Sequence, residues 1–359
     1  MRPPYSAQRR CRIFLFLLLL SAEQALLTRS VHRPHARTPS IEVFWSNDLT
    51  SQHFFLTNQS LKEWSIFGRR NSESLAEHQL PEKISYRHAP EKTVDQAVLC
   101  AQIDELISEI LKNREKKAHF AHFKILKDSD FNYIRGSGVL IAKFTDYPFV
   151  IKLFRETPET FTAPFTKGFV PSTFFVMGGG INRFLAGFTR IKNLDAINQK
   201  IAASPRWAGK VSTPRKWYWE PANVRSFTVI GHHIGAQETQ SITYPSVYCI
   251  ICDEMHGTRE LSLHSQEDRT LALELSNFIG NRIDPHICNF MIEKETGNIA
   301  FVDTEHFASI VGLDEPLEFK SYTDYFLSLA QKCLQDAFFT TKPTRLKHQQ
   351  RAVPQNLIV

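Results

Sequence analysis

The pattern of apolar and polar positions changes along the chain and predicts separate segments. Residues 28–92 mix Ser, Asn, His and Pro with little periodicity, which is typical of a variable, partly disordered lead-in. Residues 93–117 then repeat apolar side chains at helical spacing, which predicts a helix that packs on the domain after it. The apolar stripe of this helix comprises Val98, Ile103, Leu106, Ile107, Ile110 and Leu111.

Strand-like runs follow this helix. Residues 138–142 and 148–154 are rich in Val, Ile, Leu and Phe, and a turn-prone segment separates them, so we predict a β-hairpin. Residues 246–252 form another apolar run, which is typical of a buried strand. The sequences of residues 180–203 and 322–338 predict two further helices.

A second hairpin is predicted nearer the C-terminus. Residues 283–289 form a loop, a short strand follows, and residues 296–298 make the turn. The returning strand, 299–303, ends on the carboxylate of Asp303. Short strands mixed with helices in this way predict an α+β fold for residues 118–339.

Composition favours a globular domain. The 359 residues are 42% apolar and 12% aromatic, which is enough to fill a substantial core. The net charge of +6 is concentrated at the two ends, in Arg2, Arg9, Arg10, Arg12, Lys342, Arg345, Lys347 and Arg351. Because the middle of the chain is close to neutral, we expect no nucleic-acid partner, and residues 340–359 are predicted to be a basic C-terminal tail.

The first 27 residues have the layout of a signal peptide or signal anchor. Arg9, Arg10 and Arg12 precede an apolar run at 13–20, and small or polar residues follow it. A helix needs about 20 apolar residues to span a bilayer core, so a cleaved signal is favoured and an uncleaved membrane anchor stays open. Either one predicts entry into the secretory pathway, as a secreted protein or one associated with the membrane through this segment.

The cysteines favour neither a disulfide scaffold nor a metal site. Outside the N-terminal segment the chain has Cys100, Cys249, Cys252, Cys288 and Cys333, an odd and widely spaced set. Cys249 and Cys252 form a C-x-x-C motif within the apolar run, without a second pair at zinc-ligand spacing. A structural role is therefore favoured over zinc binding or redox chemistry.

Two features of the first predicted hairpin suggest a phosphate site. Gly136, Ser137 and Gly138 lie at the start of the first strand, where bare backbone N–H groups can approach phosphate oxygens. Lys152 lies inside an otherwise apolar strand, where an ammonium group is costly to bury unless an anion meets it. A glycine turn followed by two strands, the second with a V-x-K sequence, is more specific than either feature alone.

Three polar residues mark the second hairpin as a candidate metal site. Asp284 and Asn289 share the loop before it, and Asp303 returns beside them. The oxygens of Asn289 and Asp303 suit Mg²⁺, which prefers hard oxygen ligands, and Asp284 is left to orient a hydroxyl nucleophile. Each residue alone would also serve as an ordinary turn or cap residue, but their order behind Lys152 favours a nucleotide site.

This arrangement resembles the protein-kinase-like superfamily. Asp284 and Asn289 have the D-x-x-x-x-N spacing of its catalytic loop, and Asp303 falls where the superfamily keeps a metal-binding Asp. Gly136-Ser137-Gly138 is similar to a reduced glycine-rich loop, and Lys152 resembles the strand lysine that holds the α- and β-phosphates.

The resemblance extends to the hinge and indicates an atypical branch. Residues 248–255 resemble the strand that enters the hinge between two lobes, where Glu254 is expected to contact the nucleotide. Asp284-Pro285-His286-x-x-Asn289 is similar to the D-x-H-x-x-N loop of aminoglycoside and choline phosphotransferases and of the ABC1 kinases. Asp303-Thr304-Glu305 replaces the D-F-G of typical protein kinases.

The resemblance implies a two-lobed fold and phosphoryl transfer. Residues 118–339 would form a small antiparallel β lobe and a mainly helical lobe, which bind ATP with Mg²⁺ or Mn²⁺. Asn289 and Asp303 would hold the metal, Lys152 the phosphates, and Asp284 would accept a proton from a hydroxyl of a small molecule, a lipid or a protein. A pseudokinase scaffold, with or without nucleotide, and transfer of AMP by the same site stay open as alternatives.

The acidic partner of Lys152 is not evident from the sequence. In the superfamily a Glu from a helix pairs with this lysine, but the predicted helix at 180–203 has Asp195 as its one acid. The other candidates are Glu105, Glu109, Glu156 and Glu159. The lack of an obvious partner favours the pseudokinase alternative.

Aromatic and basic residues also gather at 207–219. The aromatic members are Trp207, Trp217, Tyr218 and Trp219, and the basic ones are Lys210, Arg215 and Lys216. Such a patch suits substrate binding, but packing of the rings onto the fold is favoured.

Overall fold

The computed structural model describes residues 40–46, 53–57, 75, 77–161, 181–232, 239–280, 282–305, 318–339 and 348–349. The fold is α+β, as predicted. The predicted signal segment, 1–27, lies outside the described residues, as does the predicted tail apart from 348–349. Among the helices that the structure describes, none combines the length and apolar character needed to cross a bilayer.

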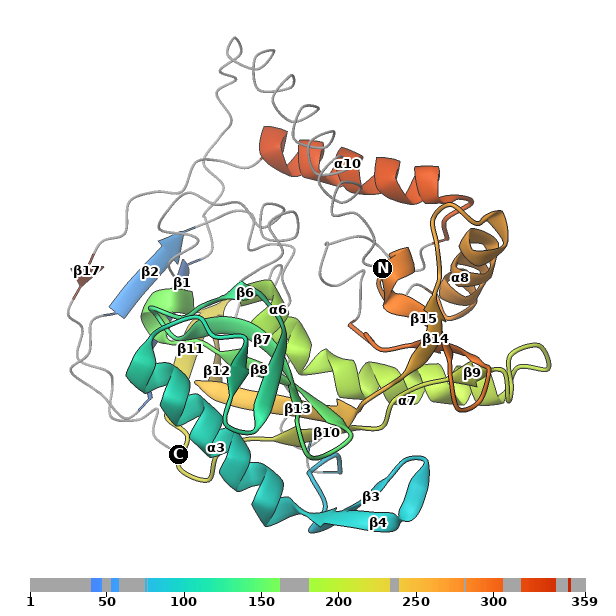
Figure 1. The fold of residues 1–359 in the computed structure, drawn as a ribbon. Helices are drawn as coiled ribbons and strands as arrows, with labels where there is room; N and C mark the ends of the chain where they lie inside the picture. The colour runs from blue at the N-terminus through green and yellow to red at the C-terminus, as the bar shows by residue number, and fades with distance from the viewer. Residues whose placement is uncertain are drawn as a thin grey trace. The chain divides into compact units, whose positions relative to one another are not determined.

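A six-stranded antiparallel sheet in the order β10-β13-β8-β7-β6-β5 organises the fold (Figure 1). Its strands are β5 (His119–Phe120), β6 (Phe123–Asn132), β7 (Ser137–Phe144), β8 (Phe149–Arg155), β10 (Lys216–Trp219) and β13 (Val247–Asp253). The pairing of β7 with β8 confirms the first predicted hairpin, and β13 is buried at every position, as its apolar sequence predicted.

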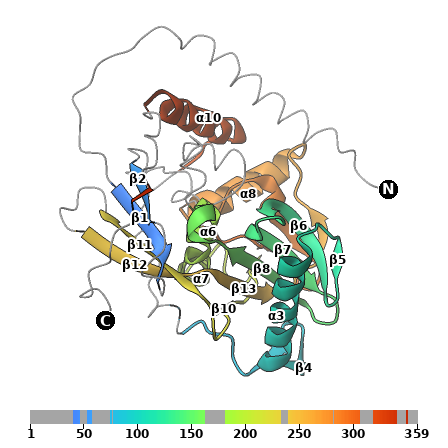
Figure 2. The same cartoon turned by 90° about the vertical axis from the view of Figure 1, so that its left-hand side faces the viewer.

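Helix α3 (Gln96–Asn113) covers one face of this sheet (Figure 2). Leu99, Ile103, Leu106 and Ile110 repeat every three or four residues, so they form one buried stripe against the strands. The helix predicted at 93–117 is confirmed with tighter bounds. Its predicted stripe began at Val98, which is wrong because that side chain is 39% exposed and Leu99 faces the sheet instead.

Helices α6 (Ile181–Gly187) and α7 (Thr189–Ala202) follow β8 and pack on the opposite face of the sheet. Aromatic rings fix the junction between them. The ring of Tyr248 on β13 stacks on Phe154 of β8 at a centroid distance of 4.6 Å and on Phe188 at 4.2 Å. The start of α7 is therefore held against the strands that surround Lys152.

A second antiparallel sheet has the order β12-β11-β1-β2-β17. Its strands are β1 (Ser40–Trp45), β2 (His53–Thr57), β11 (Ser226–His232), β12 (Thr239–Pro245) and β17 (His348–Gln349). Segments from both ends of the sequence thus join strands from its middle. Val43, Phe227, Val229 and Tyr244 of this sheet share a core with α6 and the start of α7.

The segment predicted to be a variable, partly disordered lead-in, 28–92, lies partly outside the described residues, and its described part supplies β1, β2, β3 (Lys83–Tyr86) and most of β4 (Ala89–Asp95). These strands were missed for two reasons. The main partner of β1 is β11, far along the chain, and no local pattern encodes that pairing, whereas most positions of β4 are exposed and polar, so β4 carries no apolar pattern. Arg215 anchors the β3–β4 hairpin by donating to the carbonyl oxygen of Ser85 at 2.7 Å while it pairs with Asp253.

The remaining elements lie around a third core. They are β9 (Val211–Ser212), β14 (Gly257–Glu260), α8 (Gln266–Phe278), the short 3-10 turn Ile287–Asn289, β15 (Phe290–Glu293), β16 (Ile299–Phe301) and α10 (Tyr322–Phe339). The β15–β16 pair confirms the second predicted hairpin, and α10 confirms the last predicted helix. Ile197 and Ile201 of α7 belong to this core, whereas Ile191 belongs to the core beneath the six-stranded sheet.

The C-x-x-C motif lies within β13. Cys249 belongs to the core under α3, and Cys252 lies on the opposite side of the strand, near Lys216 and Lys152. Positions three apart on a strand point to opposite faces, so the two sulfurs do not converge. Both cysteines are free thiols, in agreement with the structural role favoured above.

Candidate active site

Lys152 lies in the middle of β8, between Ile141 on β7 and Ile250 on β13. Its residue is only 7% exposed. The Nζ atom lies 3.1 Å from Oδ2 of Asp303, two residues after the end of β16. The structure therefore brings together two residues that the sequence predicted to share a site, and the carboxylate supplies the anion that a buried ammonium requires.

Asp303 receives two cations on its two oxygens. Lys152 meets Oδ2, and Nε of Arg190 donates to Oδ1 at 3.2 Å. The backbone N–H of Glu305 also donates to Oδ1, which closes a local turn. Burial alone would raise the pKa of Asp303, but the charges of Lys152, Arg190 and Lys216 hold it well below its ordinary value.

Arg190 comes from the first turn of α7 and lies between two carboxylates. Its Nη2 atom is 2.7 Å from Oε2 of Glu305, in addition to the contact of Nε with Asp303. The guanidinium group lies 5.3 Å from the ring centroid of Phe154. Burial would lower the pKa of Arg190, but Glu305 and Asp303 raise it, so the group is charged.

Lys216 is a third buried cation, on β10. Its Nζ atom donates to the carbonyl oxygen of Val302 at 3.0 Å and to Oγ1 of Thr304 at 2.6 Å. The Thr304 hydroxyl in turn donates to the carbonyl oxygen of Arg190 at 2.6 Å. Burial and the neighbouring charge of Lys152 lower the pKa of Lys216 to about 7. We refer to Lys152, Arg190, Lys216, Asp303 and Glu305 as the Asp303 cluster.

Asp284 lies in the loop before β15, with its side chain held from two sides. Oδ1 accepts hydrogen bonds from the Tyr325 hydroxyl at 2.8 Å and from the backbone N–H of His286 at 3.1 Å. Nδ2 of Asn289 donates to the backbone carbonyl of Asp284 at 3.0 Å, which orients the Asn289 amide. The loop is thus fixed by its own polar residues and by α10.

One side chain ties this loop to the segment after β16. Nδ2 of Asn193, on α7, donates to the carbonyl oxygen of Arg282 and, at 2.8 Å, to that of Thr304. The antiparallel pairing of β15 with β16 brings the same two segments together. Asp284, at the mouth of the loop, and the Asp303 cluster therefore lie at one end of the hairpin.

The glycine turn lies between β6 and β7. Gly136 has φ +60° and Gly138 has φ +115°, values that L-residues rarely adopt. A Cβ atom on Gly138 would lie 2.1 Å from the carbonyl oxygen of Asp130, so strand pairing by itself explains this glycine. Ser137 is buried at the start of β7. Phosphate contact by these three residues stays a prediction.

Glu254 directly follows β13. Its backbone N–H donates to the carbonyl oxygen of Pro148 at 2.9 Å, and its carboxylate pairs with Lys143 of β7 at 2.6 Å. Both contacts hold the end of β13 to the β7–β8 hairpin. Nucleotide contact by Glu254 stays a prediction.

The acids considered as partners of Lys152 have other positions in the structure. Asp195 pairs with His78 at 3.0 Å, Glu109 with Lys117 at 2.7 Å and Glu105 with His122 at 3.3 Å. Glu156 is buried beyond the end of β8, where burial raises its pKa to about 7. Lys152 thus takes its counter-charge from Asp303 itself.

Three members of the Asp303 cluster were not recognised as site residues. Lys216 had the same signal as Lys152, a lysine among large apolar residues of a strand, but we assigned it to an aromatic patch. Glu305 stands two residues after Asp303. Arg190 carried no local signal, because its role follows from where α7 lies in the fold.

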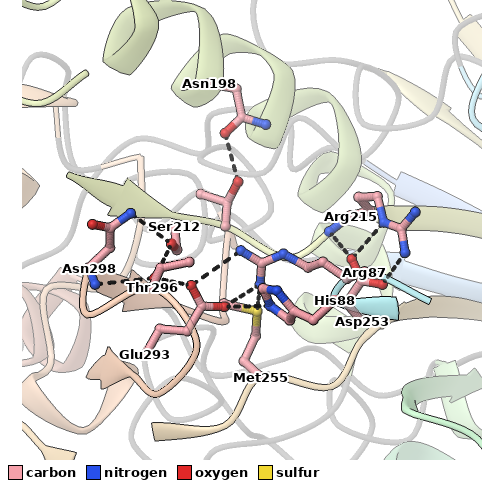
Figure 3. A network of polar contacts seen from close by, with 11 residues as sticks. Arg87, His88, Asn198, Ser212, Arg215, Asp253, Met255, Glu293, Thr296 and Asn298 are labelled. Atoms are coloured by element: carbon pink, nitrogen blue, oxygen red, sulfur yellow. Dashed lines mark hydrogen bonds and ion pairs between the residues drawn. The ribbon is translucent and has the colours of Figure 1, made fainter. Parts of the chain in front are cut away.

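A second cluster, centred on the buried carboxylate of Glu293, lies where the β3–β4 turn meets β15, and Figure 3 shows its contacts. Nη1 of Arg87 is 2.6 Å from Oε1 of Glu293, whose side chain is 0% exposed. Nε2 of His88 lies 3.4 Å from the same oxygen, and the Thr296 hydroxyl donates to Oε2 at 2.5 Å. We refer to Arg87, His88, Glu293 and Thr296 as the Glu293 cluster.

His88, Glu293 and Glu295 offer ligand atoms close enough together for one metal ion. Glu293, however, is the buried counter-charge of Arg87. Burial would raise the pKa of Glu293, but hydrogen bonds from Ser212 and Thr296 and the charge of Arg87 keep it below its ordinary value. A metal ion there would have to displace a charged, well-paired arginine, so the cluster is better suited to holding the fold.

Comparison with protein-family models, with characterised proteins and with solved structures finds no match to this chain.

Proposed function

We propose that the chain is a phosphotransferase with a two-lobed, protein-kinase-like fold, which transfers the γ-phosphoryl group of ATP to a hydroxyl group of its substrate. The order of its parts supports this. A glycine turn precedes β7, Lys152 lies on β8, and helices follow before the sheet is completed by β10 and β13. The loop of Asp284 and the hairpin ending at Asp303 come next, in the order that kinase-like proteins use.

The observation that carries the proposal is the 3.1 Å contact between Lys152 and Asp303. It joins the β-strand lysine to the carboxylate at the end of the second hairpin, two residues that are remote in sequence. In kinase-like sites the phosphates lie beside this lysine and the metal beside this carboxylate. The closeness of the two side chains is compatible with a shared nucleotide and metal site.

The residues present fit a metal–nucleotide ligand. Asp303 and Asn289 offer oxygen atoms of the kind that Mg²⁺ and Mn²⁺ prefer, and the Asp303 side chain keeps 24% of its surface exposed. Lys152, Arg190 and Lys216 surround it with positive charge, which suits phosphate oxygens. When bound, the metal neutralises charge that develops on the phosphates.

The chain's own residues divide the work of the transfer. Lys152 holds the phosphates in line with the substrate hydroxyl, and Asp284 accepts the hydroxyl proton while the oxygen bonds to the γ-phosphorus and the bond to the ADP oxygen breaks. Tyr325 and the backbone of His286 fix the Asp284 carboxylate for this role. Positioning and charge neutralisation then supply most of the rate enhancement.

A pseudokinase scaffold is the second candidate, because both oxygens of Asp303 are engaged by cations. A metal ion must draw Asp303 away from Lys152 or Arg190 before it binds. A site in which this exchange is too costly would keep the fold without turnover.

Ligand-induced stabilisation of the full chain tests the site. A ligand that binds only the folded protein raises its melting temperature. We expect Mg²⁺ with ATP to raise it for the wild type and for the control Lys124→Met, an exposed lysine on β6. Lys152→Met and Asp303→Asn should lose the shift. No shift in the wild type with Mg²⁺ or Mn²⁺ would overturn the proposal of a nucleotide site.

Turnover separates the two candidates. Asp284→Asn should keep the melting shift and lower ATP turnover by about 10²–10⁴-fold, since proton transfer by a positioned base contributes that much. Mass analysis of modified protein distinguishes a transferred phosphoryl group from AMP. A wild type that binds ATP but gives neither hydrolysis nor transfer would support the scaffold.

A further inference from the structure

Helix α7 presents a cation at the site where the kinase-like pattern has a helix carboxylate. Within the described helices α6 and α7 the one acid is Asp195, which pairs with His78 on the other side of the helix from the site. Arg190, in the first turn of α7, contacts Asp303 instead. The helix therefore adds positive charge next to Lys152 rather than neutralising it.

The guanidinium group of Arg190 is buried and held, yet incompletely bonded. The residue is 2% exposed, and Nε and Nη2 are taken by Asp303 and Glu305. Its Nη1 atom is buried without a hydrogen-bond partner among the described residues, as is Oε1 of Glu305. An unpaired N–H donor on a buried arginine is costly, so such a group indicates a binding partner of the opposite character.

The charges of the Asp303 cluster point to an anion. Asp303 is the counter-charge for both Lys152 and Arg190, and Arg190 also pairs with Glu305. If Asp303 turns to a divalent cation, Lys152 loses its carboxylate partner and Nε of Arg190 is released, while Glu305 keeps Nη2. Phosphate oxygens would replace Asp303, and the planar fork of an arginine matches a phosphate group better than a single ammonium does.

We propose that Arg190 is a second phosphate-binding residue, which together with Lys152 holds the nucleotide phosphates once Asp303 has taken up the metal ion. This inference rests on the proposed function. Phe154 behind the guanidinium group, and Thr304 on the backbone carbonyl of Arg190, keep the side chain in place for this exchange. Glu305 retains Nη2, so Arg190 stays anchored when Asp303 leaves Nε.

Calorimetric titration of the full chain with Mg²⁺·ATP and with adenosine tests the role. Arg190→Met should weaken Mg²⁺·ATP binding by about tenfold or more, the loss of roughly one charge-assisted contact, and leave adenosine binding unchanged. The affinity of Arg190→Lys for Mg²⁺·ATP should fall between those of the wild type and Arg190→Met. The control is Lys192→Met, which removes an exposed charge two residues away on α7.

The outcomes are distinct. If Arg190→Met binds Mg²⁺·ATP as tightly as the wild type, or more tightly, Arg190 is only a clamp on Asp303 and the inference fails while the proposed function stands. If the wild type itself binds no Mg²⁺·ATP, both fail. Should Arg190→Met not fold, the double variant Arg190→Met/Glu305→Gln restores the charge balance, and its ratio of Mg²⁺·ATP to adenosine affinity decides the matter.

Discussion

The Glu293 cluster and the Asp303 cluster each hold a carboxylate among basic groups, and both join segments remote in sequence, but they differ in how completely their buried atoms are bonded. Glu293 receives Arg87, His88 and Thr296, and no atom of that cluster is among the buried unpaired ones in the described residues. In the Asp303 cluster Nη1 of Arg190 and Oε1 of Glu305 have no partner there.

This difference indicates what each cluster does. A saturated network of charges fixes two segments in one arrangement and has nothing left to offer a ligand. A buried polar atom without a hydrogen-bond partner costs free energy, and such atoms are found at sites that bind a ligand or change conformation. Matched substitutions in the two clusters should therefore change different measurements.

The largest change in stability should come from Glu293→Gln. It leaves Arg87 without its buried counter-charge, which we expect to lower the free energy of unfolding by about 3 kcal/mol. Denaturant unfolding measures the loss, and the nucleotide-induced melting shift should persist. If Glu293→Gln is as stable as the wild type but has lost the nucleotide-induced melting shift, the structural role assigned to the Glu293 cluster is wrong.

The pH dependence of the free energy of unfolding should distinguish the Asp303 cluster from the Glu293 cluster. The pKa of Lys216 is lowered to about 7 in the folded protein, so between pH 7 and its ordinary value near 10.5 the unfolded chain binds more protons. Stability therefore rises with pH in this window. We expect the free energy of unfolding of wild type minus that of Lys216→Met to increase by about 2 kcal/mol from pH 7 to pH 9. Glu293, whose pKa is lowered, contributes no change in this range.

A smaller change is expected for Lys152→Met. Asp303 keeps Arg190, so no buried charge is left wholly uncompensated, and the free energy of unfolding should fall by about 1 kcal/mol. The nucleotide-induced shift should nevertheless disappear. A loss of stability as large as that of Glu293→Gln would show that the Asp303 cluster is structural as well.

The smallest effect should follow His88→Ala. The side chain of His88 is partly exposed and reaches Glu293 at 3.4 Å, whereas Arg87 provides the main counter-charge. We expect about 0.5 kcal/mol of destabilisation, as for other solvent-screened pairs. A Zn²⁺-dependent rise in the melting temperature that this variant lacks would instead identify a metal site.

The sequence was informative wherever a pattern is local. The stripe of α3, the β7–β8 hairpin, β13 and the β15–β16 hairpin follow from apolar periodicity and turn residues close together in the chain. The strand β1 was missed because its main partner, β11, lies far along the chain, and no local pattern encodes that pairing.

The site residues that the sequence predicted were likewise those with a local pattern. Lys152 and Asp303 were predictable, because each breaks an apolar strand pattern with a charge. The counter-charge of Lys152 was not, because it depends on the path of the β15–β16 hairpin. The part played by Arg190 depends on the packing of α7, which the sequence of that helix does not specify by itself.

Helix α7 also links two of the cores. Ile191 is embedded in the core beneath the six-stranded sheet, whereas Ile197 and Ile201 are embedded in the core around α8. The two ends of α7 are thus packed into different cores. Near its first turn, Arg190 and Asn193 contact the segment around Asp303. We therefore expect any change in the angle between the two cores to act through α7 and to shift the position of Asp303.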